Sequence, residues 1–324
     1  MKHISLLICS LFTAFGFAQQ TIGRIERLAP EINLLIDDNA IIEILADGFN
    51  WSEGPVWVPA LNSVLFTDVP ENKLYRWSET IGLSVYLDPS GYTGYAPNKK
   101  KSGGNGLILD ADGNLLIAQH GDRRIASVKA PLTKPGSFMT VVDNFEGSRF
   151  HSPNDLILHS NGDLFFTDPP YGLSGDTDPL RELQTNGVYR LDKEGTLSLV
   201  YDKLNRPNGL ALSPDEKTLY VANSDSRHNL WMAFDLVNGR LLNERVFFDA
   251  TSIDRPGLAD GMKVNKDGYV FATGPGGVLV FSPTGKHLGT ILTEERTSNC
   301  AFNEDESVLY MTSDRYLTRI KLKK

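Results

Sequence analysis

The stretch SPNDLILHSNGDLFFTDPPYGL, residues 152–173, determines the fold that the sequence predicts. Two apolar segments, LIL and LFFTD, flank the polar turn HSNGD. Ile, Phe and Thr favour strands and Asn-Gly-Asp favours a tight turn, so the stretch predicts a pair of antiparallel strands. The polar pair Asn154-Asp155 precedes the first strand, at a place where a strand ordinarily begins with apolar residues.

The same arrangement occurs five more times along the chain, and each copy begins with a residue that carries a side-chain oxygen. The six copies begin at Glu53, Asn105, Asn154, Asn208, Asp260 and Asn299. Successive starts are 52, 49, 54, 52 and 39 residues apart. A period near fifty residues, built from short strands and polar turns, is typical of a β-propeller blade rather than of a helical repeat.

Further strand-forming segments follow the copies, such as KLYRW and SVYL after the first and GVYRLD and LSLVYD after the third. They give four strands per repeat. We therefore predict an all-β fold, a six-bladed β-propeller with four-stranded blades and a central metal site. Residues 19–324 form a single propeller domain in this prediction, and residues 19–45 supply a strand that closes the ring with the last blade.

The first eighteen residues predict a cleaved signal peptide. Lys2 precedes an apolar run from Ile4 to Phe17, and small residues occupy positions −3 and −1 before Gln19. This run is shorter than the ~20 residues that span a bilayer, which disfavours a membrane anchor. We expect residues 1–18 to be removed and the mature protein to be exported, to the periplasm of a Gram-negative bacterium.

The composition limits the partners of the chain. The formal net charge is −8, and nucleic acids and anionic membranes bind through clustered Lys and Arg, so neither is an expected partner. Without residues 1–18, Cys300 is the one remaining cysteine, which excludes an intramolecular disulfide. A cation suits this acidic chain better, and the sequence specifies no oligomeric state.

The polar residues that start the repeats are expected to meet, because the inner strands of a propeller line one central channel. Glu53 and Asp260 supply two carboxylates, and Asn154 and Asn208 supply neutral amide oxygens. Oxygen ligands with two negative charges suit Ca²⁺, with Mg²⁺ or Mn²⁺ as alternatives. Zn²⁺ is less favoured because no His or Cys occupies these positions. Strand alternation is expected to turn Asp155 away from the axis.

A structural role is the alternative for these residues, because Asn and Asp also cap strands through local bonds to the backbone. This alternative is strongest for Asn105 and Asn299. Asn105 remains a candidate for substrate binding, because the repeat places it on the same channel.

Other motifs carry further candidates for a substrate pocket. His120 ends the second strand of its repeat, where it either orients substrate or is a packed structural histidine. Asp168 and Tyr171 are expected in the pocket wall, although the prolines between them also favour a stiff strand stop. The run Asp122-Arg123-Arg124 is expected to form an ion pair within the blade and to anchor a loop.

Several motifs together resemble a known family. They are SEGPVW around Glu53, SPNDL around Asn154, RPNGLALSPDEKTLYVANS around Asn208 and LADGMKVNKDGYVFATG around Asp260. With them, the chain after residue 45 resembles the family of senescence marker protein, gluconolactonase and regucalcin, which are six-bladed propellers. The segments QHGDRRI and FTDPPYGL resemble specifically its bacterial gluconolactonase branch.

This resemblance implies a lactonase that holds one divalent metal ion, usually Ca²⁺, in the central channel. Glu53, Asn208 and Asp260 match direct metal ligands of the family, and Asn154 matches a residue beside the metal that binds substrate or a metal-bound water. Asp260 also matches the residue taken as general acid/base. Animal members have Arg-Phe before the Asn-Asp pair, where this chain has Ser152-Pro153, so the contact of that Arg with a sugar hydroxyl does not transfer.

The function predicted from the sequence is that of a divalent-metal-dependent carboxylic-ester hydrolase that opens sugar lactones, such as glucono-1,5-lactone, to the aldonic acid. A metal ion would polarise the lactone carbonyl, and Asp260 would relay a proton to the ring oxygen. One alternative is a related metal-dependent arylesterase or phosphotriesterase, because a fold does not fix the reaction. Another is a non-catalytic sugar-binding propeller with a structural calcium.

Overall fold

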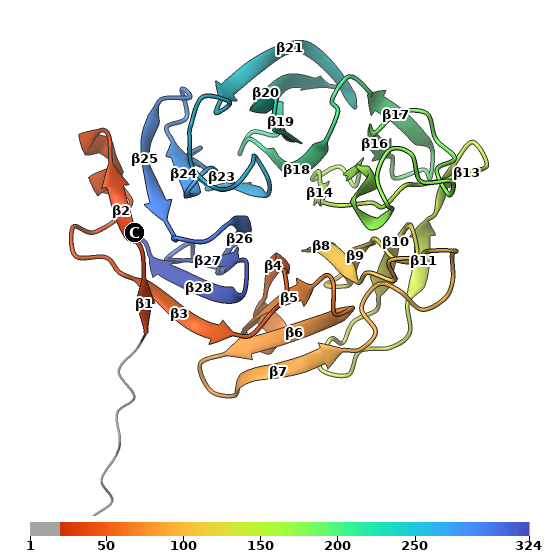
Figure 1. The fold of residues 1–324 in the computed structure, drawn as a ribbon, viewed down its shortest axis with the longest axis horizontal. Coiled ribbons are helices and arrows are strands. Elements are labelled where there is room, and N and C mark those ends of the chain that lie inside the picture. Colours follow the sequence, from red (N-terminus) through yellow and green to blue (C-terminus); the bar gives the residue numbers. More distant parts are fainter. Residues whose placement is uncertain (1–19, 324) are drawn as a thin grey trace, which may run out of the picture.

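The computed structural model describes residues 20–323, which form an all-β ring of antiparallel blades around a central axis (Figure 1). The strands of each blade are ordered from the axis outward, and each blade is built on four strands. The prediction of a six-bladed propeller with four-stranded blades is therefore confirmed. The predicted signal peptide lies outside the described residues.

The first three blades follow one another along the chain, with a short two-stranded sheet between the second and the third. They are β4 (Ser52–Val58), β5 (Ser63–Asp68), β6 (Lys73–Ser78) and β7 (Gly82–Leu87); then β8 (Gly104–Leu109), β9 (Leu115–Gln119), β10 (Arg124–Val128) and β11 (Met139–Val142); then β14 (Leu156–Leu158), β15 (Leu164–Asp168), β16 (Gly187–Leu191) and β17 (Leu197–Tyr201).

The next three blades complete the ring. They are β18 (Pro207–Leu212), β19 (Thr218–Asp225), β20 (His228–Val237) and β21 (Arg240–Asp249); then β22 (Met262–Val264), β23 (Val270–Gly274), β24 (Gly277–Phe281) and β25 (His287–Leu292); then β26 (Thr297–Phe302), β27 (Val308–Ser313), β28 (Tyr316–Lys321) and β3 (Ile42–Asp47).

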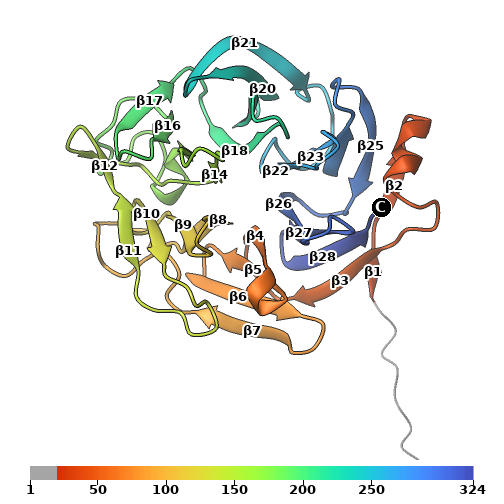
Figure 2. The same ribbon diagram turned by 180° about the vertical axis from the view of Figure 1, so that it is seen from behind.

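The two ends of the described chain meet at blade six (Figure 2). β3 pairs antiparallel with β28, from Asp47 opposite Tyr316 to Ile42 opposite Ile320. This is the closing strand that the sequence predicted. The N-terminal segment also adds β1 (Thr21–Ile22) to β3, and β2 (Arg24–Arg27) to the outer edge of β25 in blade five. The strand on blade five was not expected from the sequence.

The remaining elements are short. β12 (Asn144–Phe145) pairs with β13 (Ser148–Arg149), and three 3₁₀ turns are η1 (Pro30–Leu34), η2 (Pro59–Leu61) and η3 (Pro170–Gly172). In residues 20–323 no helix is long and apolar enough to cross a membrane.

The inner strands lose their regular pairing beside the axial polar residues. The strand register shifts in β4, β8, β18 and β26 next to Glu53, Asn105, Asn208 and Asn299 respectively. In blades three and five, the regular strand starts only after the axial residue. Such irregularities re-aim side chains, so neighbouring residues at these positions do not follow simple strand alternation.

Threonine hydroxyls of second strands hold neighbouring blades together near the axis. Thr67 Oγ1 donates to the carbonyl of Asn105 at 3.1 Å, and Thr167 Oγ1 donates to that of Asn208 at 2.8 Å. Thr273 Oγ1 lies 2.8 Å from the carbonyl oxygens of both Gly261 and Ser298. Because these contacts join one blade to the next beside an axial residue, they fix the axial side chains relative to one another.

Candidate active site

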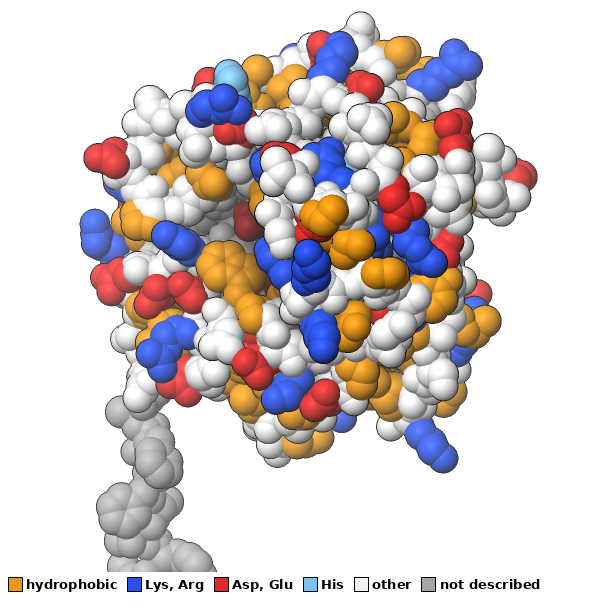
Figure 3. Space-filling view, turned by 45° about the vertical axis from the view of Figure 1, so that its right-hand side comes forward, with side chains coloured by type: hydrophobic (Ala, Val, Ile, Leu, Met, Phe, Trp, Pro, Cys, Tyr) orange, Lys and Arg blue, Asp and Glu red, His pale blue; other side chains and the backbone are white. Residues whose placement is uncertain are grey.

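The axial residues form the floor of a cavity of about 770 Å³. Glu53, Asn105, Asn154, Asn208 and Asp260, one from each of blades one to five, all line it. Figure 3 shows a recess in the surface with an acidic side chain inside it. A cavity of this size is typical of sites for small organic molecules.

The two carboxylates at the floor lie in an environment that opposes their charge. Burial raises the pKa of Glu53 to about 8, and the Asp155 carboxylate acts in the same direction, although the Gly54 N–H donates to Glu53 Oε2 at 2.7 Å. Burial, together with the charges of Glu53 and Asp155, raises the pKa of Asp260 well above its ordinary value. Asp260 Oδ1 has no hydrogen-bond partner among the described residues. Such a pair needs either a proton or a cation to balance it.

Neighbouring side chains orient the amides between these carboxylates. Asn208 Nδ2 donates to Ser224 Oγ at 2.8 Å, and Ser224 Oγ in turn donates to the carbonyl of Ala259. Asn105 Nδ2 and Asn154 Nδ2 lie 3.3 Å and 3.5 Å from His120 Nε2. Since each amide turns its nitrogen outward, its oxygen is left for the axis.

The cavity wall contains His120, which is 3% exposed. Burial, with the nearby Lys100 ammonium, lowers its pKa to about 3, so its imidazole is neutral at physiological pH. A neutral Nε2 without a proton accepts hydrogen bonds, which matches the two amide nitrogens that face it. The sequence left open whether His120 orients substrate or is structural, and its position allows it to orient the two amides.

Tyr171 reaches the cavity from the turn η3. Its hydroxyl hydrogen-bonds Ser224 and Asn208, and burial beside Asp260 raises its pKa, so it remains protonated. The turn is held by Ser152, whose Oγ donates to the carbonyl of Pro169 at 2.6 Å and accepts the Gly172 N–H at 2.8 Å. Lys100 Nζ caps the same turn by donating to the Tyr171 carbonyl at 2.9 Å.

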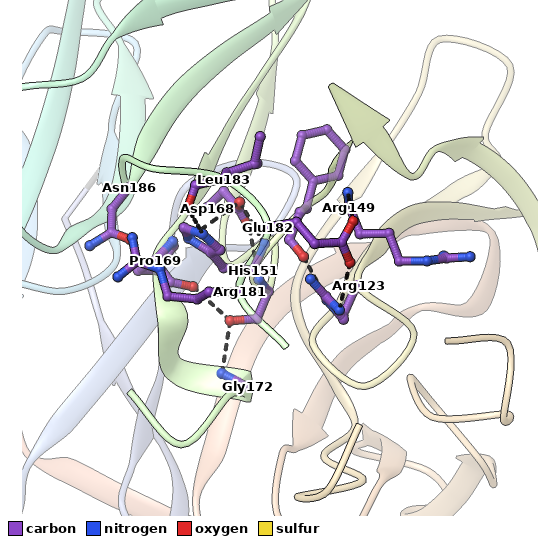
Figure 4. A network of polar contacts seen from close by, with 12 residues as sticks. Arg123, Arg149, His151, Asp168, Pro169, Gly172, Arg181, Glu182, Leu183 and Asn186 are labelled. Carbon is purple, nitrogen blue, oxygen red and sulfur yellow. Dashed lines mark hydrogen bonds and ion pairs between the residues drawn. The ribbon is translucent and has the colours of Figure 1, made fainter. Parts of the chain in front are cut away.

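Asp168 is fully buried and does not line the cavity. Its carboxylate accepts the backbone N–H groups of His151 at 2.8 Å and of Ser152 at 2.7 Å (Figure 4). The structure therefore places Asp168 behind the wall, where it holds the segment that leads into Asn154.

The run QHGDRRI anchors loops, as the sequence predicted. Arg124 pairs with Asp122 at 3.1 Å within blade two. Arg123 donates to the carbonyl of Phe150 at 2.7 Å and lies 3.4 Å from Glu182, on the loop between β15 and β16 (Figure 4). These contacts tie blade two to the loop that follows the Tyr171 turn.

The expectation that Asp155 turns away from the axis is wrong. The Asn299 side chain acts to lower the pKa of the Asp155 carboxylate, which opposes the charges of Glu53 and Asp260. The physical reason is the irregular backbone at this position. Four of the other axial residues are followed by glycine, and a Cβ at Gly106 would lie 2.6 Å from Asp155 Oδ1. The Asp155 carboxylate thus packs against the inner strand of blade two.

The chemistry of these groups fits a divalent cation. Glu53, Asn154, Asn208 and Asp260 present carboxylate and amide oxygens, and Asn105 Oδ1 and Asp260 Oδ1 are buried without a partner among the described residues. Hard cations such as Ca²⁺ prefer oxygen ligands of this kind. Residues 20–323 contain no group of three or more His, Cys, Asp or Glu side chains arranged to hold a metal, which is consistent with a site in which amides supply half of the oxygens.

Sequence reasoning missed several residues of the cavity. Ser224 orients Asn208, and Trp51 and Leu258 provide apolar wall, while the exposed Arg296 stands at the rim. Ser224 lies near the end of β19, beyond the segment that the repeat defines, and Trp51, Leu258 and Arg296 lie on loops between strands. The sequence signal that could have located them is their place next to an axial strand, such as Trp51 two residues before Glu53.

The chain is similar to several known proteins. A family model described as SMP-30/Gluconolactonase/LRE-like region matches residues 51–315. A gluconolactonase from Zymomonas mobilis is 40% identical over 314 residues, covering 94% of this chain and 87% of that protein. The solved structure of a gluconolactonase from Xanthomonas campestris has a TM-score of 0.81 at 31% identity, covering 95% of this chain and 99% of that one. A calcium-binding regucalcin from Agrobacterium tumefaciens, 22% identical with a TM-score of 0.66, covers 86% of this chain and 92% of its own and shares the fold.

Proposed function

Because this chain belongs to the SMP-30/gluconolactonase/LRE-like family, we propose that it is a divalent-metal-dependent lactonase that opens sugar lactones, such as glucono-1,5-lactone, to the aldonic acid. The relatives named as gluconolactonases support lactone hydrolysis. The observation that carries the proposal is the convergence of Glu53, Asn154, Asn208 and Asp260 on the floor of one cavity.

Ca²⁺ is the cation that the proposal assigns to this floor, with Mg²⁺, Mn²⁺ or Zn²⁺ as alternatives to be ranked by experiment. Glu53, Asn154, Asn208 and Asp260 would hold it. When bound there, a divalent ion supplies Lewis-acid polarisation of the lactone carbonyl.

The residues around the floor provide the proton chemistry. Hydrolysis adds water to the carbonyl carbon and breaks the bond from that carbon to the ring oxygen, which must receive a proton. The proposal gives this transfer to Asp260, since its Oδ1 is free of protein partners and a positioned carboxylate contributes about 10²–10⁴-fold. Tyr171 keeps its proton and can donate a hydrogen bond to a sugar hydroxyl.

The cavity wall also suits a sugar. Asn105, His120 and Tyr171 offer polar groups, while Trp51 offers an aromatic face on which a sugar ring can pack. A second reaction class is favoured by the apolar side chains in the wall, which are Trp51, Val69, Pro70 and Leu258. Such side chains would accept the aryl group of an ester, so aryl esters belong among the substrates to be tested.

The test is hydrolysis of glucono-1,5-lactone followed by acid release in a pH-stat, with the spontaneous rate subtracted. Chelation should abolish turnover, and readdition of Ca²⁺, Mg²⁺, Mn²⁺ or Zn²⁺ should rank the metals. Asp260→Asn should lower kcat by at least about 100-fold. Asp267→Asn, on the exposed turn of the same blade, is the matched control and should keep full activity. Turnover that survives chelation, or aryl-ester hydrolysis without lactone hydrolysis, would contradict the proposal.

Export to the periplasm is part of the proposal. Its support is the sequence of residues 1–18, with a basic start, a short apolar run and small residues before Gln19. Expression of the full chain in a Gram-negative host should give a periplasmic protein whose mass corresponds to a chain that starts at Gln19. An unprocessed protein in the cytoplasm would refute this part.

A further inference from the structure

The channel beneath the cavity floor contains a polar group that the proposed mechanism does not use. Asp155 is 2% exposed and Asn299 is 2% exposed, and neither lines the cavity. Lys263, on the inner strand β22 of blade five, reaches this group with its ammonium 3.4 Å from Asn299 Oδ1 and 3.0 Å from its neighbouring carbonyl, that of Met262.

Asn299 connects the ammonium to the carboxylates. Its Oδ1 accepts the Cys300 N–H at 2.9 Å as well as the Lys263 ammonium. Its side chain also acts to lower the pKa of the Glu53 and Asp155 carboxylates, as an amide does when its Nδ2 hydrogens face them, and Asp155 Oδ2 is buried without a hydrogen-bond partner among the described residues. Lys263 therefore sits on the oxygen side of an amide whose nitrogen side faces two buried carboxylates.

Charge explains why an ammonium is needed at this place. Glu53, Asp155 and Asp260 bring three carboxylates together, and each of them opposes the ionisation of another. The Lys263 ammonium acts in the opposite direction on both Glu53 and Asp155. Three carboxylates and one ammonium give a net charge of −2, which matches one divalent cation.

We propose that Lys263 is a positioning residue that acts as a built-in counter-charge to Asp155. The proposed cation site then carries a net charge of −2, which one divalent ion neutralises. The inference rests on the cation site of the proposed function. It assigns Lys263 two effects of opposite sign. The ammonium stabilises the protein without metal, because it balances the carboxylates, and it weakens cation binding, because it repels the ion.

A lysine that merely covers the end of the channel with its aliphatic stem would behave differently. Its removal would lower stability with and without metal, and it would leave cation affinity unchanged or reduce it through disorder. The opposite signs expected for stability and affinity therefore distinguish the two roles.

The experiment compares the wild type with Lys263→Met, Asp155→Asn and the double variant. Each is measured by calorimetric titration with Ca²⁺ after chelation and by thermal unfolding of the metal-free protein. Met keeps an unbranched side chain of nearly the same length and removes the ammonium with its hydrogen bonds, and Lys263→Arg is the matched variant that retains the charge.

Lys263→Met should bind Ca²⁺ at least about tenfold more tightly and should unfold at a lower temperature without metal. Asp155→Asn should bind Ca²⁺ at least about tenfold more weakly and should gain metal-free stability. The double variant should return toward the wild type in both Ca²⁺ affinity and metal-free unfolding temperature. Lys263→Arg should stay close to the wild type in both measurements. A Lys263→Met protein that folds only in the presence of Ca²⁺ also supports the inference.

Unchanged or weaker Ca²⁺ binding in Lys263→Met, or additive effects in the double variant, would overturn the inference. If Lys263→Met does not fold under any condition, the test rests on Asp155→Asn. An unchanged Ca²⁺ affinity of Asp155→Asn would then overturn the inference. The wild-type titration separates the two proposals. A wild type without Ca²⁺ binding refutes the cation site of the proposed function and the inference with it, whereas a binding wild type with unaffected variants refutes only the inference.

Discussion

The stability of the metal-free protein should fall as the pH rises above neutrality, because burial makes the folded protein hold a proton on Glu53. The perturbation is removal of divalent cations by a chelator. Burial raises the pKa of Glu53 from its ordinary 4.5 to about 8, so the folded protein holds this proton over a range in which the unfolded chain has lost it. Stability is therefore lost as the pH rises toward the folded pKa.

The pH range of the measurement is chosen so that the buried histidines no longer affect stability. The pKa of His120 is lowered to about 3, and that of His287 is also lowered by burial, so both add stability as the pH rises to their unfolded value of about 6.5 and then stop. Above about pH 6.5 the pH dependence of stability comes from the buried carboxylates. Asp260, whose pKa is raised by burial and by Glu53, adds a loss of the same sign.

The magnitude can be worked from the Glu53 pKa. A full proton difference changes the free energy of unfolding by about 1.4 kcal/mol per pH unit. With a folded pKa of about 8, Glu53 alone should lower it by about 2 kcal/mol between about pH 6.5 and about pH 8.5. The unfolding entropy of some 300 residues is about 0.6 kcal/mol per degree, so the midpoint should fall by about 3 °C, with more from Asp260.

Differential scanning calorimetry in chelator across this range is the assay. Saturating Ca²⁺ should raise the midpoint and flatten its pH dependence, because a bound cation keeps both carboxylates ionised. Glu53→Gln should remove part of the slope in chelator. A metal-free midpoint that is constant or rises over this range would refute the argument that burial raises the pKa of these carboxylates.

Three further outcomes test other parts of the structure. Thr273→Val removes a hydroxyl that faces two carbonyls of blades five and six, and it should lower the free energy of unfolding by about 1–3 kcal/mol in urea titration; an unchanged midpoint would contradict a bond between blades. Tyr171→Phe loses contacts to Ser224 and Asn208, and it should raise KM or lower kcat several-fold for glucono-1,5-lactone at unchanged stability; full activity would exclude Tyr171 from the site. Cys300 is buried and burial raises the pKa of its thiol to about 12, so it should react with a disulfide reagent only in denaturant, and rapid labelling of the folded protein would show that β26 opens.

The repeat was sufficient to predict the propeller, because its polar starts and short strands record a contact pattern that recurs in every blade. Residues that share a register position must meet on the axis. For this reason the sequence could place Glu53, Asn154, Asn208 and Asp260 together although they lie about fifty residues apart. It could also predict that the N-terminal segment closes the ring, because the last repeat supplies only three strands and β3 completes its blade.

Features that depend on local backbone geometry could not be predicted. Asp155 was assigned to the wrong side, because strand alternation was assumed at a position where the regular strand has not yet started. Asp168 is the last residue of β15, and Tyr171 follows three residues later in η3. The direction of the chain after Pro169 brings only Tyr171 to the cavity. Lys263 gave a signal that went unused, since a charged residue inside the inner strand of a buried channel requires a partner.

The pairing of β3 with β28 sets the order in which the molecule can be assembled. A ribosome delivers residues 42–47 long before residues 316–321, so β3 lacks its partner β28 while most of the blades are being made. β2 waits in the same way for β25. The final blade thus joins the first and the last parts of the described chain, and it stands between blades five and one, which carry Asp260 and Glu53. A chain that ends before residues 316–321 would therefore lack the closed ring that holds these two carboxylates together.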